Sequence, residues 1–570
     1  MMPGPFGALT RYFVSVLLAP PLLTDLGADY LRRTIASLVA MVLVAGIFLT
    51  RVFFRKYADL GGLTYPDAYL RALQSDTLLM IAVPMLVVGI AAVVLCPLLF
   101  PDETDYHVLT PLPLRRITIF AAKLTAIAIA GGIIVFAVSA ISSFWFPLAT
   151  GGRRAPYPML ARVAAHAVAT VLGSAWMFSA VAAFQGLSLL LIPSTWRRLG
   201  LALQGSVIVV LLGSVPFITR LPARMISPET VTSLPLAAFP PAWFFALEQW
   251  LLQPDRTDGY VLMAVYALRA LIVTVAFIAA CYAVMYRTAE RLSSLSPTRA
   301  EVAGKWSLLG LEQRYGMRPA AAGAIDFAIA GLARSRLHQF VFVMVIGCGI
   351  AVLIGQIATA FATHPAATSP SRDAIHAALA APLLTSLAVA IALRAAFLLP
   401  SDRSAAWVFR LTEEPGTRTA ALDAVAWCLT VPVVTTSLVV AAAVQPRMLG
   451  GMWLLSAAFT AGASLVLIEA VLSDWNRIPF TCSYLPGKRV LAYNLGVVLG
   501  AYFVFVYVGA HAIRWSLVSP LRTLIAAGTV VAAVFLMRRA RLRTWGLPAL
   551  DFEDYDPMAI RTLGLLPDER

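Results

Sequence analysis

Residues 77–101 read TLLMIAVPMLVVGIAAVVLCPLLFP, a run of 25 residues without a charged side chain. A helix needs about 20 predominantly apolar residues to cross the hydrocarbon core of a bilayer, so this run is long enough to span it. Similar runs recur along the chain, in which 60% of the 570 residues are hydrophobic and 13% are charged. Because a soluble domain carries roughly 25% charged residues, the composition excludes a water-soluble protein and predicts an all-α, polytopic integral membrane protein.

Stretches bounded by charged residues give about twelve predicted transmembrane helices. They are residues 34–50, 77–101, 124–152, 163–196, 199–219, 259–286, 337–371, 374–401, 424–446, 448–472, 490–513 and 515–537. An even number places both termini on one side of the membrane, and the excess of Lys and Arg in the segments on that side indicates the cytoplasm. We therefore expect a multi-pass protein of the cytoplasmic membrane. In this orientation the first outer loop contains four basic residues, Arg51, Arg55, Lys56 and Arg71. They contradict the rule that Lys and Arg are more frequent on the cytoplasmic side.

A charged connection over residues 287–336 separates six predicted spans from six, and the two halves resemble each other. A shift of 300 residues aligns Asp102 with Asp402. A partly apolar segment precedes the first span of each half, residues 11–30 and 324–337, and suits a helix lying along the inner membrane surface. Because each half has an even number of spans, the sequence predicts two parallel repeats. The predicted regions are a first half over 1–286, a cytosolic linker with the second interfacial helix over 287–336, a second half over 337–537 and a cytosolic tail over 538–570.

The connection after the second span, residues 100–116, reads FPDETDYHVLTPLPLRR. Pro101 ends one helix and Asp102 can cap the next. The acidic first turn of this short helix complements the positive end of its dipole. Tyr106 and Leu109 stand at helical spacing and give the helix an apolar edge. Such a helix is suited to docking on a cytosolic partner.

This connection resembles the coupling helix of type II ABC exporters, in which a membrane-spanning permease is driven by a separate ATPase. In that family an acidic stretch, a Leu-Pro turn and basic residues follow the second of six helices, and each half begins with an interfacial elbow helix. The second half keeps Asp402 and Trp407 but lacks the Leu-Pro turn, which predicts a degenerate second coupling site. The resemblance implies that seven residues of the first half couple the permease to the ATPase. They are Asp102, Asp105, Tyr106, Leu109, Pro113, Arg115 and Arg116.

The resemblance also implies short re-entrant helices on the outer side, between the fifth and sixth spans. Residues 239–252 occupy that place and read FPPAWFFALEQWLL. Trp243 and Trp250 lie on one face of this predicted helix. Two interpretations of these tryptophans stay open, an outer gate on the substrate path and an aromatic belt at the membrane interface.

Two charged residues are further candidates for the substrate path or its gate. Arg269 lies about ten residues into the sixth span, roughly 15 Å at 1.5 Å per residue, and therefore near the bilayer centre. It either lines a cavity that attracts an anionic or zwitterionic substrate, or it forms a structural pair. Glu469, close to the inner end of the tenth span, is either a solvated interfacial charge or a member of a gate or ion pair.

The sequence contains no nucleotide-binding loop, dinucleotide fingerprint, zinc-protease motif or serine-hydrolase motif, and its five cysteines are scattered singly. We therefore expect no catalytic, cofactor-binding or metal-binding residue in this chain, and expect ATP and Mg in a cytosolic ABC ATPase partner present in two copies. The net charge of +15 gathers between the apolar runs and indicates topology and lipid contact, not nucleic-acid binding. The basic residues 538–543 predict an anchor for anionic lipids.

Taken together, these patterns predict the permease subunit of an ABC-type exporter, which is not itself an enzyme and moves its substrate outward by alternating access. One alternative is a twelve-helix secondary transporter driven by an ion gradient, although few ionisable residues lie deep enough in the spans to relay protons. The other alternative is a non-transporting membrane scaffold or a membrane enzyme, for which Asp59 and Asp67 are the only candidate acids, and solvated loop charges explain these better.

Overall fold

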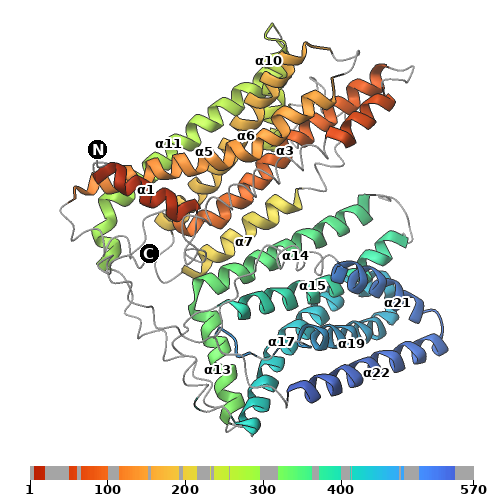
Figure 1. Ribbon diagram of the computed structural model, residues 1–570. Helices are drawn as coiled ribbons and strands as arrows, with labels where there is room; N and C mark the ends of the chain where they lie inside the picture. Colours follow the sequence, from red (N-terminus) through yellow and green to blue (C-terminus); the bar gives the residue numbers. More distant parts are fainter. Residues whose placement is uncertain are drawn as a thin grey trace, which may run out of the picture. The chain divides into compact units, whose positions relative to one another are not determined.

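The computed structural model describes the chain in two compact units, Met1–Pro297 and Thr298–Arg570, each with its own apolar core (Figure 1). All regular structure in the described residues is helical, and they contain 15 α-helices. The described residues are 5–18, 50–60, 66–99, 114–151, 156–191, 197–214, 232, 237–255, 257–294, 319–362, 372–399, 411, 414–473, 475, 477–480 and 500–545.

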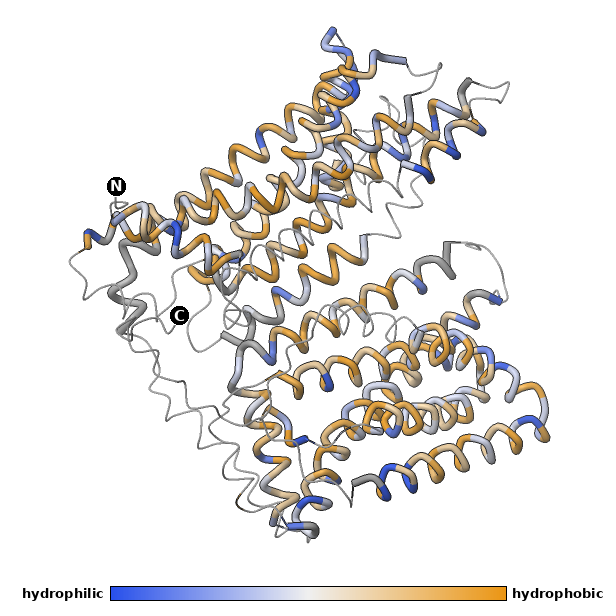
Figure 2. The backbone as a smooth tube through the Cα atoms, in the orientation of Figure 1, coloured by the Kyte–Doolittle hydropathy of each residue, from blue (hydrophilic) through white to orange (hydrophobic). Residues whose placement is uncertain are grey.

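Nine of the described helices are long and apolar enough to cross a membrane, and apolar residues run along most of their length in Figure 2. The protein is therefore a polytopic helical membrane protein, as predicted. Each of the nine falls on a predicted span. The other three predicted spans, 34–50, 199–219 and 490–513, lie partly outside the described residues. The nine are Ala68–Cys96, Ile117–Ala149, Met159–Leu191, Gly259–Val284, His338–Ile357, Ala374–Leu398, Gly416–Val444, Pro446–Val471 and Pro520–Arg543.

In the first unit three long helices pack around a fourth, α6, and a short helix covers one end of them. Helices α3, α5 and α11 each contact α6, and α10 contacts α3, α6 and α11 (Figure 1). Small residues permit this close packing: a Cβ atom built on Gly173 of α6 would lie 3.0 Å from Met85 Sδ of α3 and 3.1 Å from the Phe244 ring of α10. The helices are α1 (Pro5–Leu18), α3 (Pro66–Leu99), α5 (Arg116–Ala149), α6 (Met159–Leu191), α7 (Arg197–Gly213), α10 (Pro240–Leu252) and α11 (Gly259–Ser294).

Helix α1 lies in the region where the sequence predicts an interfacial helix over residues 11–30, of which 19–30 lie outside the described residues. It packs on α5 through one apolar face. The ring of Phe13 on that face is buried, and the Lys123 ammonium lies over it at 5.2 Å from the ring centroid. Because Lys123 is itself buried, the aromatic face supplies part of the stabilisation that this cation loses by leaving water.

The second unit begins with a short helix, α13, ahead of its long ones. Helix α13 packs on α17 and α14, while α15 contacts α14, α17 and α19 (Figure 1). The elements are α13 (Pro319–Arg334), α14 (Arg336–Ala362), α15 (Arg372–Leu398), α17 (Pro415–Val444), α18 (Pro446–Leu449), the 3-10 turn η5 (Gly450–Met452), α19 (Trp453–Val471), the π-helix η6 (Tyr502–Val508), α21 (Gly509–Ser516) and α22 (Pro520–Trp545).

Phe480 holds the ends of several helices of the second unit together. Its side chain is fully buried, and its ring makes edge contacts with His338 of α14 at 4.6 Å and with Phe397 of α15 at 5.6 Å between centroids. A Cβ atom at Gly331 of α13 would overlap the same ring, so the glycine makes room for it. The backbone of Phe480 has a φ of 68°, a left-handed conformation that is unfavourable for a bulky residue. Packing on α13, α14 and α15 therefore maintains this conformation.

Candidate functional site

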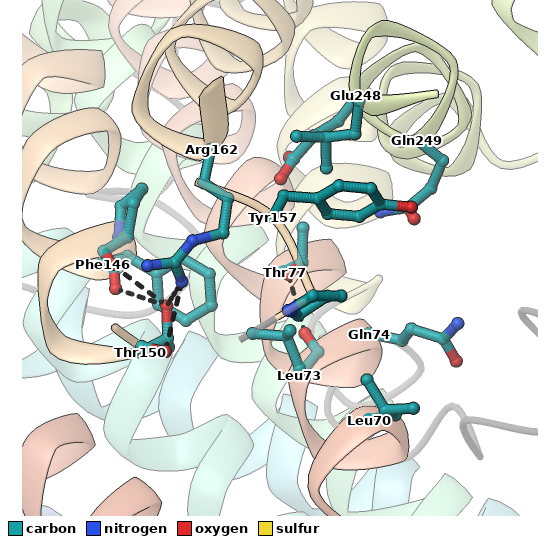
Figure 3. Close-up of a pocket in the computed structure, with 13 residues that line it drawn as sticks. Leu70, Leu73, Gln74, Thr77, Phe146, Thr150, Tyr157, Arg162, Glu248 and Gln249 are labelled. Atoms are coloured by element: carbon teal, nitrogen blue, oxygen red, sulfur yellow. Dashed lines mark hydrogen bonds between the residues drawn. The ribbon is translucent and has the colours of Figure 1, made fainter. Parts of the chain in front are cut away.

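A pocket of about 230 Å³ opens at one end of the first unit, where α3 and α6 begin and α5 and α10 end (Figure 3). Its wall is apolar on several sides and carries one cationic and one acidic side chain. The lining residues are Leu70, Leu73, Gln74, Thr77, Phe146, Pro147, Thr150, Pro156, Tyr157, Arg162, Glu248, Gln249 and Leu252.

Helix α10 carries the acidic side chain of the pocket into the apolar core. Two prolines, Pro240 and Pro241, start the helix, where a missing N–H costs nothing. Phe244, Phe245 and Leu247 are buried against the long helices and hold α10 in place. Glu248, the one acidic residue of α10, follows them directly and is buried as well.

A histidine of α6 is the hydrogen-bond partner of this buried carboxylate. His166 Nδ1 lies 2.8 Å from Glu248 Oε2, and the two side chains are only 1% and 7% exposed. A carboxylate or an imidazolium buried alone in an apolar core costs several kcal/mol, so each group needs the other. The His166–Glu248 pair thereby ties α10 to α6.

The hydrogen bonds continue from His166 to α5 and α3. His166 Nε2 lies 2.9 Å from Ser142 Oγ, and the Ser142 hydroxyl donates to the carbonyl of Met80 at 2.6 Å. Four residues after Met80 stands Pro84, which has no N–H, so the carbonyl lacks its normal helical donor. Ser142 supplies that donor from the neighbouring helix.

Counting protons along this chain of bonds fixes the charge of the buried pair. Ser142 has one hydroxyl proton and gives it to Met80, so His166 Nε2 must donate to Ser142 Oγ. The remaining proton lies between His166 Nδ1 and Glu248, and either position leaves the pair with no net charge. The order Ser, His and acid matches that of a hydrolase triad, but His166 has no lone pair left to take the serine proton. Ser142 is therefore not an activated nucleophile.

We expect Ser142→Ala to lower the free energy of unfolding by about 1–3 kcal/mol, because it leaves the buried Met80 carbonyl without a donor. Pro84→Ala restores an N–H four residues after Met80, so the same serine substitution should cost less in a Pro84→Ala background. A double-mutant cycle on the purified protein in mixed micelles measures this difference. Equal costs of the serine substitution in the two backgrounds would contradict the assignment.

Arg162 is the cation of the pocket and is 7% exposed. Its Nη1 donates to Thr150 O at 3.1 Å and to Thr150 Oγ1 at 3.2 Å, and the same carbonyl accepts a bond of 2.8 Å from the Tyr69 hydroxyl. These donors satisfy the C-terminal end of α5, where carbonyls lack helical partners. The buried Nε has no hydrogen-bond partner, and within the described part of the chain no carboxylate forms an ion pair with this guanidinium.

A second buried carboxylate lies near the beginning of α3. Asp76 Oδ2 forms an ion pair with Lys56 Nζ at 2.6 Å and accepts a hydrogen bond of 2.8 Å from the Tyr57 hydroxyl. Burial, and then the charge of Asp76, raise the pKa of Tyr57 far above its ordinary value, so the phenol stays a donor. Lys56 is one of the four basic residues that the predicted topology places in the first outer loop, where Lys and Arg are unusual. Its ion pair with Asp76 neutralises its charge.

Most of the predicted coupling residues lie outside the described residues, so their roles stay predictions. Arg115 directly precedes α5 in an extended conformation with an exposed side chain, and Arg116 is the first residue of α5. The coupling residues outside the described residues are Asp102, Asp105, Tyr106, Leu109, Pro113, Asp402 and Trp407.

The predicted outer-side tryptophans pack on the core that holds α10. Trp243 Nε1 donates to Ala237 O at 2.8 Å, and its ring meets Trp176 of α6 edge-on at 5.5 Å between centroids. Trp250 packs on the same apolar cluster. Arg269 lies on α11 with an exposed side chain, and the structure brings none of these three residues together with the pocket. Their part in a substrate path stays a prediction.

Glu469 is a member of a buried ion pair, one of the interpretations that the sequence left open. Its Oε1 accepts a bond of 2.9 Å from Arg541 Nη2, and Oε2 lies 2.6 Å from Arg541 Nε. Arg541 belongs to the basic residues 538–543, for which the sequence predicts contact with anionic lipids. Because Arg541 is 4% exposed, it is not available to lipid headgroups.

Sequence reasoning missed His166, Glu248 and Arg162. A lone acid in an apolar helix is a recognised signal of an intramembrane site, and Glu248 within residues 239–252 met that description. Arg162 gives no such signal, because it stands at the boundary of a predicted span, where a cation is ordinary.

No protein-family model matches this chain, and neither a curated protein nor a solved structure does. The class that the fold supports is a polytopic helical membrane protein with nine candidate spans in its described residues.

Proposed function

We propose that this chain is the permease subunit of an ABC-type exporter, which moves a substrate outward by alternating access driven by a separate cytosolic ATPase present in two copies. The observation that supports the proposal most is α10. Its 13 residues extend about 20 Å, too short to cross a bilayer, yet the helix is buried among α3, α6 and α11 directly before α11 begins. The resemblance to type II ABC exporters implies a re-entrant helix at this place.

The short helices at the start of each unit support the same proposal. Helix α1 packs on α5, and α13 packs on α17. Both α5 and α17 are the long helices that directly follow the predicted coupling connection of their unit. Elbow helices in two parallel six-helix repeats would have this arrangement.

Helix α5 offers a physical route from an ATPase to the outer side. It begins at Arg116, where the predicted coupling connection ends, and its 34 residues extend about 50 Å to the pocket. There Thr150 is bonded to Arg162, and Ser142 is bonded to His166, which holds α10. A displacement of the coupling connection is thereby transmitted by a continuous helix to the re-entrant helix.

Co-purification tests the proposal. Tagged full-length protein is purified from its native membrane in mild detergent, and the preparation is assayed for an ATP-hydrolysing subunit. We expect the subunit with the wild type, and expect its loss from a variant carrying Asp102→Lys and Leu109→Lys. Asp255→Lys, an exposed charge change between α10 and α11, is the matched control and should retain the subunit. An intact wild type without any ATPase or nucleotide dependence would contradict the proposal.

One observation favours the alternative of an ion-gradient-driven transporter. The His166–Glu248 pair holds a buried proton, and Glu248 lines a pocket through which that proton can exchange. Uptake or release of substrate by vesicles under an imposed pH gradient, without ATP, distinguishes this function from the first.

A further inference from the structure

We propose that the pocket at the junction of α3, α5, α6 and α10 binds a phosphate group, carried by a small molecule or by a lipid headgroup, with Arg162 as its cation. The proposal needs neither an ATPase nor transport, so it stands apart from the function proposed above. It rests on three observations: the incomplete hydrogen bonding of the Arg162 guanidinium, the charge of the pocket, and the size and lining of the pocket.

One edge of the Arg162 guanidinium has no partner among the described residues. Nη1 bonds to Thr150, whereas Nε is unsatisfied and Nη2 makes no hydrogen bond to the described residues. Nε–H and Nη2–H point the same way from a guanidinium and bind two oxygens of a phosphate in parallel. The absence of a side chain at Gly151 keeps Nη2 uncovered on that side, since a Cβ atom there would lie 3.1 Å from it.

The charge of the pocket favours an anion. Glu248 is the acidic residue of the lining, and the proton count makes its pair with His166 neutral. Asp76 does not line the pocket and is paired with Lys56. Among the described residues Arg162 therefore contributes the net charge of the pocket, and a buried cation that forms no ion pair with these residues is stabilised by an anionic ligand.

The size and lining favour a small polar head next to an apolar part. A volume of about 230 Å³ is below the roughly 300–1,000 Å³ of pockets that enclose a drug-sized ligand. Figure 3 shows the Arg162 guanidinium on one side of the pocket and the polar ends of Tyr157 and Gln249 on the other. A phosphate at Arg162 would place an attached polyol near Tyr157 and Gln249, while Leu70 and Leu252 offer apolar contacts.

Binding to the purified full chain in a neutral detergent tests the proposal. The probes are glycerol 3-phosphate and dioctanoylphosphatidylglycerol, with dioctanoylglycerol as the neutral control, and the readouts are calorimetric titration and native mass spectrometry. We expect one saturable site for at least one phosphate probe and none for the neutral lipid. Binding of both probes indicates recognition of the phosphate alone, and binding of only the lipid indicates a headgroup site.

Three variants connect the binding to the pocket. Arg162→Gln removes the charge but keeps an amide donor for Thr150, and we expect it to weaken binding by about tenfold or more. Leu73→Trp fills the pocket without changing the cation and should weaken binding equally, which keeps the test valid if the Arg162 variant fails to fold. Arg11→Gln removes an exposed cation of α1, in the same unit but outside the pocket, and should bind as the wild type. A folded wild type that binds neither phosphate probe, or pocket variants that bind normally, would overturn the proposal.

Discussion

Replacing His166 by leucine is expected to lower the free energy of unfolding by about 3–5 kcal/mol, because the substitution leaves the Glu248 carboxyl buried without its partner. This is one of the two largest effects that we expect of a single substitution in this protein. Unfolding by dodecyl sulfate in mixed micelles, followed by circular dichroism, measures it.

The matched control for this substitution removes both members of the pair. With leucine at His166 and at Glu248, neither position carries a buried polar group without a partner, so the double variant should be more stable than His166→Leu alone. A double variant less stable than the single one would show that the two side chains do not depend on each other. A loss below about 1 kcal/mol for His166→Leu would show that Glu248 has access to water.

Phe480→Ala is expected to cost about 3–5 kcal/mol, since it empties a fully buried ring site at which α13, α14 and α15 meet. Phe503→Ala, which truncates a ring that is 58% exposed on η6, is the matched control and should change stability little. Thermal unfolding of the purified protein distinguishes the two variants.

A second substitution tests the contact of Phe480 with α13. Gly331→Ala should destabilise the wild type, because the added methyl group overlaps the Phe480 ring. In a Phe480→Ala background the same methyl group enters free space, so its cost should largely disappear. Equal costs in both backgrounds would mean that the ring does not pack on Gly331.

The membrane spans could be predicted from the sequence because each depends on its own residues. A run such as 77–101 is apolar throughout, and no distant residue is needed to interpret it. The short helix over residues 239–252 could be expected from the resemblance to type II ABC exporters, which implies a helix at this place, and from the helical spacing of Trp243 and Trp250. Nine of the twelve predicted spans therefore coincide with described helices.

The hydrogen-bonded site could not be predicted in the same way, because its members are far apart in sequence. His166 lies 24 residues from Ser142 and 82 residues from Glu248, and no local pattern indicates that they meet. Depth in a predicted span points to Arg269, whereas the structure places that side chain on an exposed face and buries Glu248. Depth in the membrane and burial in the protein are different quantities, and a single sequence reports only the first.

The proline in α3 makes the shape of one helix depend on the position of another. At Pro84 the backbone of α3 lacks a bond of its own, and the Ser142 hydroxyl of α5 takes its place. If α5 slides along α3, the Met80 carbonyl loses its donor and the helix is free to bend at that point. The shape of α3 at Pro84 and the position of α5 along it are thus coupled through the hydrogen bond from Ser142 to Met80.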